Sequence, residues 1–231
     1  KLNRNIDKVS MERVCVELKK TLLSDNPDYC SLYATTGLFN NILPVIADNL
    51  TGRYAKKLLL TCKYTDNELP LRLAAILFVC SPDEARTALR NLRMDNKTID
   101  TVVKILTYTP LHIDETEPAV REALHQCGRD IFMLVIRLQR ASIKASEEIT
   151  FISNPAKYNH LNKLQRMEDD ILERGDCFTI KALDISGNDL IEYGLQGHEI
   201  GETLKSLLDI VIENPKLNDK ATLIAMIEHI K

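Results

Sequence analysis

The fold is decided at the C-terminal end of the chain, where residues 185–213 read ISGNDLIEYGLQGHEIGETLKSLLDIVIE. This pattern predicts a short helix, a turn that carries Gly194 and Gly197, and a second helix that starts around Gly201. The apolar positions of the second helix recur at helical spacing and lie on one face; they are Ile200, Leu204, Leu207, Leu208 and Val211. The stretch therefore predicts two helices that pack through a tight glycine turn.

Helical spacing also dominates the chain upstream of this stretch. The run Ser81-Pro82-Asp83-Glu84 combines a capping residue, a proline at the first helical position and the glutamate of a capping box. One long helix is expected from about Pro118 to Ile152, before Asn154-Pro155 stops it. Alternating strand patterns are nearly absent, and residues 177–180 are too short to anchor a sheet. We therefore predict an all-α protein, built as an irregular and elongated multi-helix array.

The composition is that of a globular chain. Of the 231 residues, 45% are hydrophobic and 27% are charged, and no apolar run approaches the roughly 18 residues of a membrane-spanning helix, so we expect no membrane partner. The six cysteines form no CxxC pair, which indicates reduced thiols in a cytoplasmic protein. Because the net charge is −3, any contact with RNA must come from local basic stripes.

The C-terminal stretch resembles the tail of bacterial tRNA nucleotidyltransferases, the CCA-adding enzymes of the poly(A) polymerase family. Residues 11–27 resemble the later part of the family's neck, and residues 71–77 and 89–97 resemble its body. The resemblance implies three parts, which are a neck remnant (1–45), a helical body (46–175) and a helical tail (176–231).

The catalytic head of that family has no counterpart in this sequence. Its Gly-Gly-x-Val-Arg loop and its metal-binding Asp-x-Asp are absent. The neck motif Glu-Asp-x-x-Arg-x-x-Arg is absent too, because Glu168-Asp169-Asp170 is followed by Leu172 at the place of the first arginine. We expect this acidic run to be a solvated helix face. Nucleotide transfer needs carboxylates that hold magnesium, so we assign this chain no catalytic residue, no metal ligand and no cofactor.

A basic stripe is expected on the predicted long helix. At 100° per residue, its four cations fall within an arc of about 80° that is turned away from the apolar stripe; they are Arg129, Arg137, Arg140 and Lys144. Such a stripe can follow a phosphate backbone. The alternative is an ordinary solvated face, and Glu147 shares the arc.

Two further places could contact RNA. On the helix that Ser81 caps, Arg86, Arg90 and Arg93 lie within about 60° of one another, with a solvated face again as the alternative. In the tail, the backbone N–H groups around Gly197 and Gly201 can bind phosphate at a helix N-terminus, with His198 and Lys205 adding a donor and a charge. The alternative is that the glycines shape a turn, with Gly201 permitting close packing.

The resemblance implies that this chain grips the acceptor and T-arm of tRNA by shape and backbone contacts, as suits double-stranded RNA. It also implies that a separate head adds CCA, or part of it, using CTP, ATP and magnesium, so we expect the sequence to be a catalytically inert part of a longer protein. Two alternatives remain, namely a helical protein-interaction module and a degenerate HD-type phosphohydrolase domain. The first predicts a contiguous exposed apolar patch, and the second predicts a bound metal.

Overall fold

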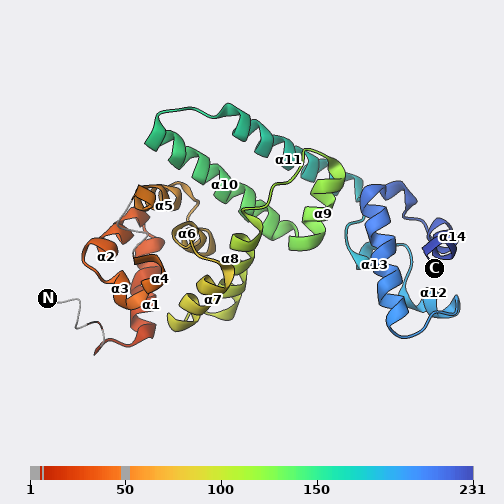
Figure 1. The fold of residues 1–231 in the computed structure, drawn as a ribbon, viewed down its shortest axis with the longest axis horizontal. Helices are drawn as coiled ribbons and strands as arrows, with labels where there is room; N and C mark the ends of the chain where they lie inside the picture. Colours follow the sequence, from red (N-terminus) through yellow and green to blue (C-terminus); the bar gives the residue numbers. More distant parts are fainter. Residues whose placement is uncertain (1–5, 7, 48–52, 231) are drawn as a thin grey trace. The chain divides into compact units, whose positions relative to one another are not determined.

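The computed structural model describes residues 6, 8–47 and 53–230 (Figure 1). Within these ranges every regular element is a helix, which confirms the predicted all-α class. The chain divides into two compact units, and each is assembled from two separate stretches of sequence. The first unit combines residues 1–112 with 129–161, and the second combines 113–128 with 162–231.

The first unit is a set of short helices around one apolar core. Leu18, Phe39, Leu73 and Leu138, which come from four different helices, are all fully buried in it. The longest helix of the unit, α10, packs along α5 and also contacts α8 and α6. The helices are α1 (Met11–Leu22), η2 (Pro27–Cys30), α2 (Ser31–Thr35), α3 (Phe39–Ile42), α4 (Pro44–Ala47), α5 (Arg53–Tyr64), α6 (Leu69–Ile76), α7 (Pro82–Asn91), α8 (Asn96–Tyr108) and α10 (Arg129–Thr150).

Local capping signals set several helix ends in the first unit. The Ser81 hydroxyl accepts from the Glu84 N–H, and the Glu84 carboxylate accepts from the Ser81 N–H, so the predicted capping box is confirmed. At the C-terminal end of α1, the buried Arg72 guanidinium donates to the carbonyl oxygens of Leu22 and Ser24. The Leu22 carbonyl belongs to the last turn of α1 and the Ser24 carbonyl lies beyond it, so neither has a partner within the helix.

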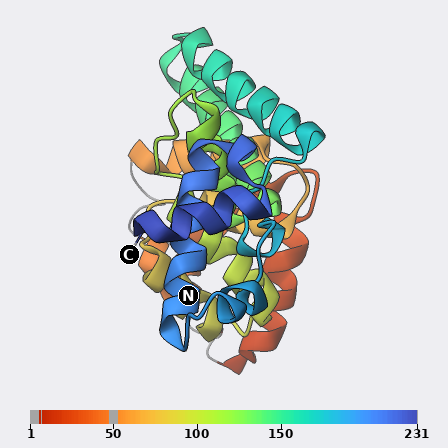
Figure 2. The ribbon, with the colours of Figure 1, turned by 90° about the vertical axis from the view of Figure 1, so that its right-hand side faces the viewer.

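The second unit is built around α13 (Figure 2). Figure 2 shows α14 crossing α13, and the two helices pack through the fully buried Leu207, Leu208 and Leu223. Its helices are α9 (Glu117–Cys127), the later part of α11 (Pro155–Arg174), η3 (Ile180–Ala182), α12 (Gly187–Glu192), α13 (His198–Glu213), η4 (Pro215–Leu217) and α14 (Lys220–Ile230).

A buried arginine holds three parts of the second unit together. Arg121 of α9 exposes only 2% of its side chain. Its guanidinium donates to the carbonyl oxygens of Ile212 (2.6 Å) and Glu213 (3.3 Å), which end α13. It also donates to the Asp176 carboxylate at 2.9 Å. A charge this deeply buried is stable only because each of these partners is in place.

The predicted single helix from Pro118 to Ile152 is wrong. The structure has α9 and α10 instead, and Gly128 separates them with φ 79° and ψ 156°. This region of backbone space is open almost only to glycine. The apolar spacing continues across the break, which is why periodicity alone predicted one helix.

Candidate nucleic-acid interface

The three arginines predicted on α7 have different surroundings. Arg86 donates to Asp100 of α8 at 2.7 Å, so its charge is already paired. Arg90 is exposed and forms no ion pair with any residue that the structure describes. Arg93 does not lie on the helix, because α7 ends at Asn91, so the prediction of one three-residue helical stripe is wrong.

Arg93 lies just beyond the C-terminal end of α7, at the position where the chain leaves the helix. Its φ is +56°, and the N–H groups of Arg93 and Met94 donate to the carbonyls of Arg90 and Leu89. This is the Schellman arrangement, in which glycine normally takes the left-handed position. An L side chain there costs about 1–2 kcal/mol. The sequence pattern missed this helix end because no glycine marks it.

Arg90 and Arg93 border a hollow of about 310 Å³ at the N-terminus of α1. Ser10 and Glu12 also line it, and the Ser10 hydroxyl makes no capping bond to α1. Two guanidinium groups and a helix N-terminus favour an anion at this place. The Glu12 carboxylate, 3.9 Å from the Arg93 guanidinium, partly offsets that attraction.

The stripe predicted on α10 is not turned away from the core along its whole length. Arg137 is only 30% exposed, because its guanidinium donates to Asp66 at 2.7 Å and also to Glu68. Both carboxylates lie in the connection between α5 and α6, so Arg137 fastens α10 to that connection. The pattern placed it on a free face because helical angles do not show which neighbouring helix covers a face.

Lys144 of α10 is exposed and lies over an aromatic ring of α5. Its ammonium is 4.2 Å from the centre of the Tyr64 ring, within the range of a cation–π interaction. The Tyr64 hydroxyl donates to Glu148, and this hydrogen bond raises the pKa of the tyrosine. Of the other two members of the predicted stripe, Arg129 is exposed and Arg140 is half-buried.

The glycine turn of the tail is present, but its second helix begins earlier than predicted. Gly194 and Gly197 both have positive φ, at 103° and 56°, which confirms the predicted turn. The helix α13 starts at His198, so Gly201 lies inside its first turn. A Cβ atom added at Gly201 would meet nothing within 4 Å, so close packing does not require glycine there.

The first turns of α13 carry more negative than positive charge. His198 is exposed, and its Nε2 lies 3.8 Å from the Glu202 carboxylate. Lys205 lines a hollow of about 540 Å³ together with Glu199, Glu202 and Asp209. Three carboxylates beside one ammonium oppose the phosphate attraction that a helix N-terminus provides. The electrostatics of this end of the second unit therefore favour RNA less than those of α7 and α10.

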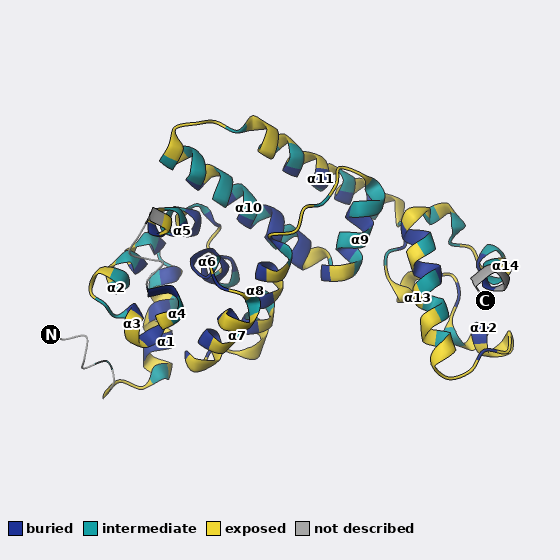
Figure 3. Cartoon of the chain, in the orientation of Figure 1, coloured by how far each residue is buried: buried dark blue, intermediate teal, exposed yellow. Residues whose placement is uncertain are grey.

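A loop that the sequence pattern did not single out presents an aromatic side chain. Phe151 follows α10, is 90% exposed and has φ +57°. The next residue, Ile152, is 69% exposed, and Figure 3 shows the connection between α10 and α11 as largely exposed. The feature of the sequence that could have revealed this exposed loop is the apolar pair Phe151-Ile152, which stands where turn residues would be expected before Asn154-Pro155.

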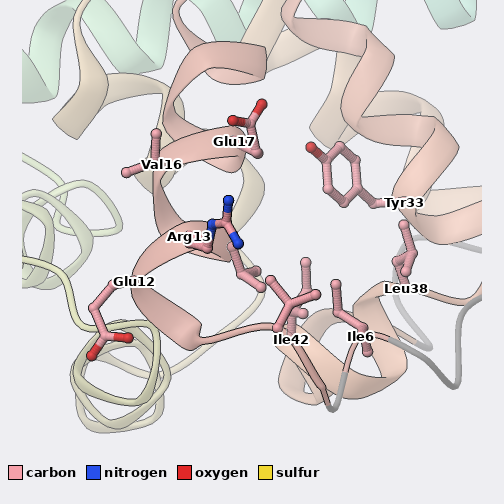
Figure 4. A pocket seen from close by; sticks show the side chains of 10 residues that line it. Ile6, Glu12, Arg13, Val16, Glu17, Tyr33, Leu38 and Ile42 are labelled. Atoms are coloured by element: carbon pink, nitrogen blue, oxygen red, sulfur yellow. The ribbon is translucent and has the colours of Figure 1, made fainter.

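An apolar groove of about 670 Å³ runs along the outer face of α1 (Figure 4). Val9 and Val16 line it and are 39% and 48% exposed. Two carboxylates, Glu12 and Glu17, stand beside a single guanidinium, Arg13, along the same groove. With this lining the groove is suited to apolar groups rather than to a phosphate backbone.

The acidic run of α11 differs from the prediction of a solvated face. Glu168 is fully buried, whereas Asp169 and Asp170 are exposed. Among the residues that the structure describes, no three His, Cys, Asp or Glu side chains come together as a metal site would require. No helix in the described ranges is both long and apolar enough to cross a membrane.

In comparison with known proteins, two family models match this chain. A family model described as "Probable RNA and SrmB- binding site of polymerase A" matches residues 1–50. No curated protein and no solved structure matches the chain. A second family model, "tRNA nucleotidyltransferase domain 2 putative", matches residues 66–227, which is more than two thirds of the sequence. The resemblance inferred from the tail is thereby confirmed, and the chain belongs to this tRNA nucleotidyltransferase family.

Proposed function

We propose that this chain is the tRNA-gripping part of a nucleotidyltransferase that adds CCA, or part of it, to tRNA 3′ ends. The observation that carries the proposal is the family match over residues 66–227, which contains α7, α10 and α13. The grip would act on the acceptor and T-arm through backbone and shape, since the deep groove of an RNA duplex hides the identity of its bases.

In this proposal the chemistry belongs to a catalytic head outside this sequence. That head would bind CTP or ATP and magnesium. The contribution of these helices is orientation, because holding the acceptor arm fixes the 3′ end relative to the reacting nucleotide. The six buried free cysteines agree with a reducing compartment, so the same proposal places the protein in the cytoplasm.

The cations support this function unequally. Arg90, Arg93 and Lys144 are exposed, and Arg93 has only a long 3.9 Å contact with Glu12. Arg137 and Arg86 instead form close ion pairs with carboxylates of the same unit. We therefore assign the phosphate contacts mainly to the first group. Arg137 is expected to contribute chiefly to the packing of α10.

The test is equilibrium binding of a fluorescein-labelled tRNA transcript, followed by anisotropy at several salt concentrations. The Arg90→Glu/Lys144→Glu variant should bind at least tenfold more weakly than the wild type. Its plot of log affinity against log salt should be flatter, by roughly 0.7–0.9 for each phosphate that the variant no longer neutralises.

The matched control is Lys97→Glu/Lys104→Glu, which makes two charge reversals at exposed cations of α8 outside the predicted contacts and so has the same net charge. It should change the affinity by less than twofold. Failure of the wild type to bind tRNA would contradict the proposed function. An equal decrease in the control would show that net charge, rather than these two positions, determines binding.

A further inference from the structure

Phe151 is held in place by the helix that precedes it. Its N–H donates to the Glu147 carbonyl oxygen at 2.7 Å, a bond that closes the end of α10 with Phe151 in the left-handed conformation. The conformation turns the chain sharply at the point where the aromatic side chain is exposed. The side chain therefore projects from a defined helix end rather than from a long unconstrained loop.

The rest of the loop is tied to the carboxylate of Glu147. This group accepts from the Asn154 N–H at 2.6 Å, the Ser153 hydroxyl at 3.3 Å and the Tyr158 hydroxyl at 3.1 Å. Tyr158 lies on α11, so one side chain joins both helices and the loop between them. Partial burial, followed by this hydrogen bond, raises the pKa of Tyr158. Such a loop loses little conformational entropy when its tip binds a partner.

The surroundings of Phe151 favour a nucleic acid over a protein partner. Thr150, Ser153 and Lys157 beside it are polar, and Ile152 is its one apolar neighbour in the loop. Protein interfaces usually place an aromatic residue within a wider packed patch. Lys144 and Lys157 are exposed on the two helices that the loop connects, where Glu148 of α10 is exposed as well.

We propose that Phe151 stacks on an unpaired base of the bound RNA. Aromatic side chains commonly bind bases that lie outside a duplex in this way, because every base has a flat face. The inference rests on the proposed tRNA binding and adds an interaction that does not involve phosphate. It assigns Glu147 as the positioning residue that holds the loop.

The proposal is tested with the full chain and the same labelled tRNA transcript. Phe151→Ala should weaken tRNA binding about tenfold, or ~1.4 kcal/mol, whereas Phe151→Trp should bind like the wild type. The salt slope should stay the same in both variants, because every phosphate stays neutralised as in the wild type. A perfectly paired RNA duplex offers no accessible base, so wild type and Phe151→Ala should bind it equally.

Two further variants separate stacking from loop structure. Phe151→Gly keeps the left-handed backbone and should reduce tRNA affinity as much as Phe151→Ala. Glu147→Ala should reduce it in part, and Glu147→Gln, which keeps an acceptor for the Asn154 N–H, should restore it. Wild-type tRNA affinity in Phe151→Ala would overturn this inference alone, and would direct attention to a protein ligand for the loop. Absence of tRNA binding by the wild type would overturn both this inference and the proposed function.

Discussion

Two of the residues that the structure describes occupy backbone positions that suit glycine better. Arg93 and Phe151 both follow the last residues of a helix with positive φ, and their N–H groups close the ends of α7 and α10. Each side chain lowers the stability of its helix end relative to glycine. Both are exposed, so neither side chain gains much from packing within the fold, where Arg93 has a 3.9 Å contact with the Glu12 carboxylate.

Arg93→Gly should therefore separate stability from binding. The free energy of unfolding should rise by about 1 kcal/mol, because the left-handed strain at the end of α7 is removed. The affinity for tRNA should fall severalfold, because one guanidinium beside the hollow at α1 is removed. Urea unfolding followed by circular dichroism and anisotropy with labelled tRNA measure the two effects.

Arg93→Lys is the matched control, since it keeps both the positive charge and the strained backbone. Neither its stability nor its affinity should change much. A variant with glycine at this position that is less stable than the wild type would show that the Arg93 side chain stabilises the fold through contacts with its own neighbours.

At the scale of helices, local signals in the sequence predicted most of what the structure shows. The capping box at Ser81 and the turn at Gly194 and Gly197 are local, because their chemistry lies within four residues. Whether a distant segment of the chain covers a side chain cannot be predicted from the residues near it in the sequence. Nothing near Arg137 in the sequence indicates that Asp66 would pair with it, so its accessibility could not be read from helical angles.

The same limit applies to the break between α9 and α10. Apolar residues keep a helical phase on both sides of Gly128, and a glycine inside such a pattern is ambiguous between an interior position and a helix end. Phe151 shows the converse, because a residue that is unfavourable in the left-handed region ends α10 at Thr150, two residues before the end that Asn154-Pro155 predicted. Helices could thus be predicted, whereas their junctions and the contacts of their polar faces could not.

Gly128→Ala distinguishes a helix end at Gly128 from a position inside one continuous helix, because its effect on the free energy of unfolding has opposite signs in the two cases. In the observed structure, alanine must adopt φ 79° and ψ 156°, which should lower the free energy of unfolding by about 1–3 kcal/mol. Space is not the cause, because an added Cβ would meet nothing within 4 Å. A single continuous helix would instead gain about 1 kcal/mol from the substitution. Thermal and urea unfolding would therefore decide whether α9 and α10 are separate helices in solution.

Asp176 follows α11 and pairs with both Arg174 at the end of that helix and Arg121 of α9. Partial burial raises the pKa of this carboxyl, but hydrogen bonds and positive charge from Arg174 and Arg121 outweigh burial and lower the pKa overall. A carboxyl whose pKa is lower in the folded state contributes stability above its unfolded pKa of about 4, and this stability is lost as the pH falls.

Asp176→Asn should cost about 3 kcal/mol at pH 7, because the buried Arg121 then lacks its least exposed carboxylate. The difference from wild type should shrink as the pH falls below about 4, because the carboxyl of the unfolded wild-type chain then takes up a proton while the folded one, with its lower pKa, still resists protonation. Urea unfolding at pH 7 and at pH 3.5 measures both. Asp170→Asn, at an exposed position of α11, should behave like the wild type at each pH; a constant difference for Asp176→Asn across this range would contradict the assigned role of its charge.

The molecule as a whole has no excess of positive charge, and its cations are unevenly distributed over the surface. The net charge is −3, so long-range attraction to RNA is weak and binding must depend on a few local contacts. Arg90 and Arg93 share their hollow with one carboxylate, Glu12, whereas Lys205 shares its hollow on α13 with three. Of these two hollows, the one beside α7 therefore suits an RNA backbone better.

The six cysteines are all buried as free thiols. Burial raises the pKa of Cys15 and Cys177, and that of Cys80 reaches about 11. Only the thiolate reacts with maleimides and iodoacetamides, so the native protein should take up such dyes slowly at neutral pH. A cysteine introduced on the exposed surface can then carry a spectroscopic label by itself, with the natural six left in place.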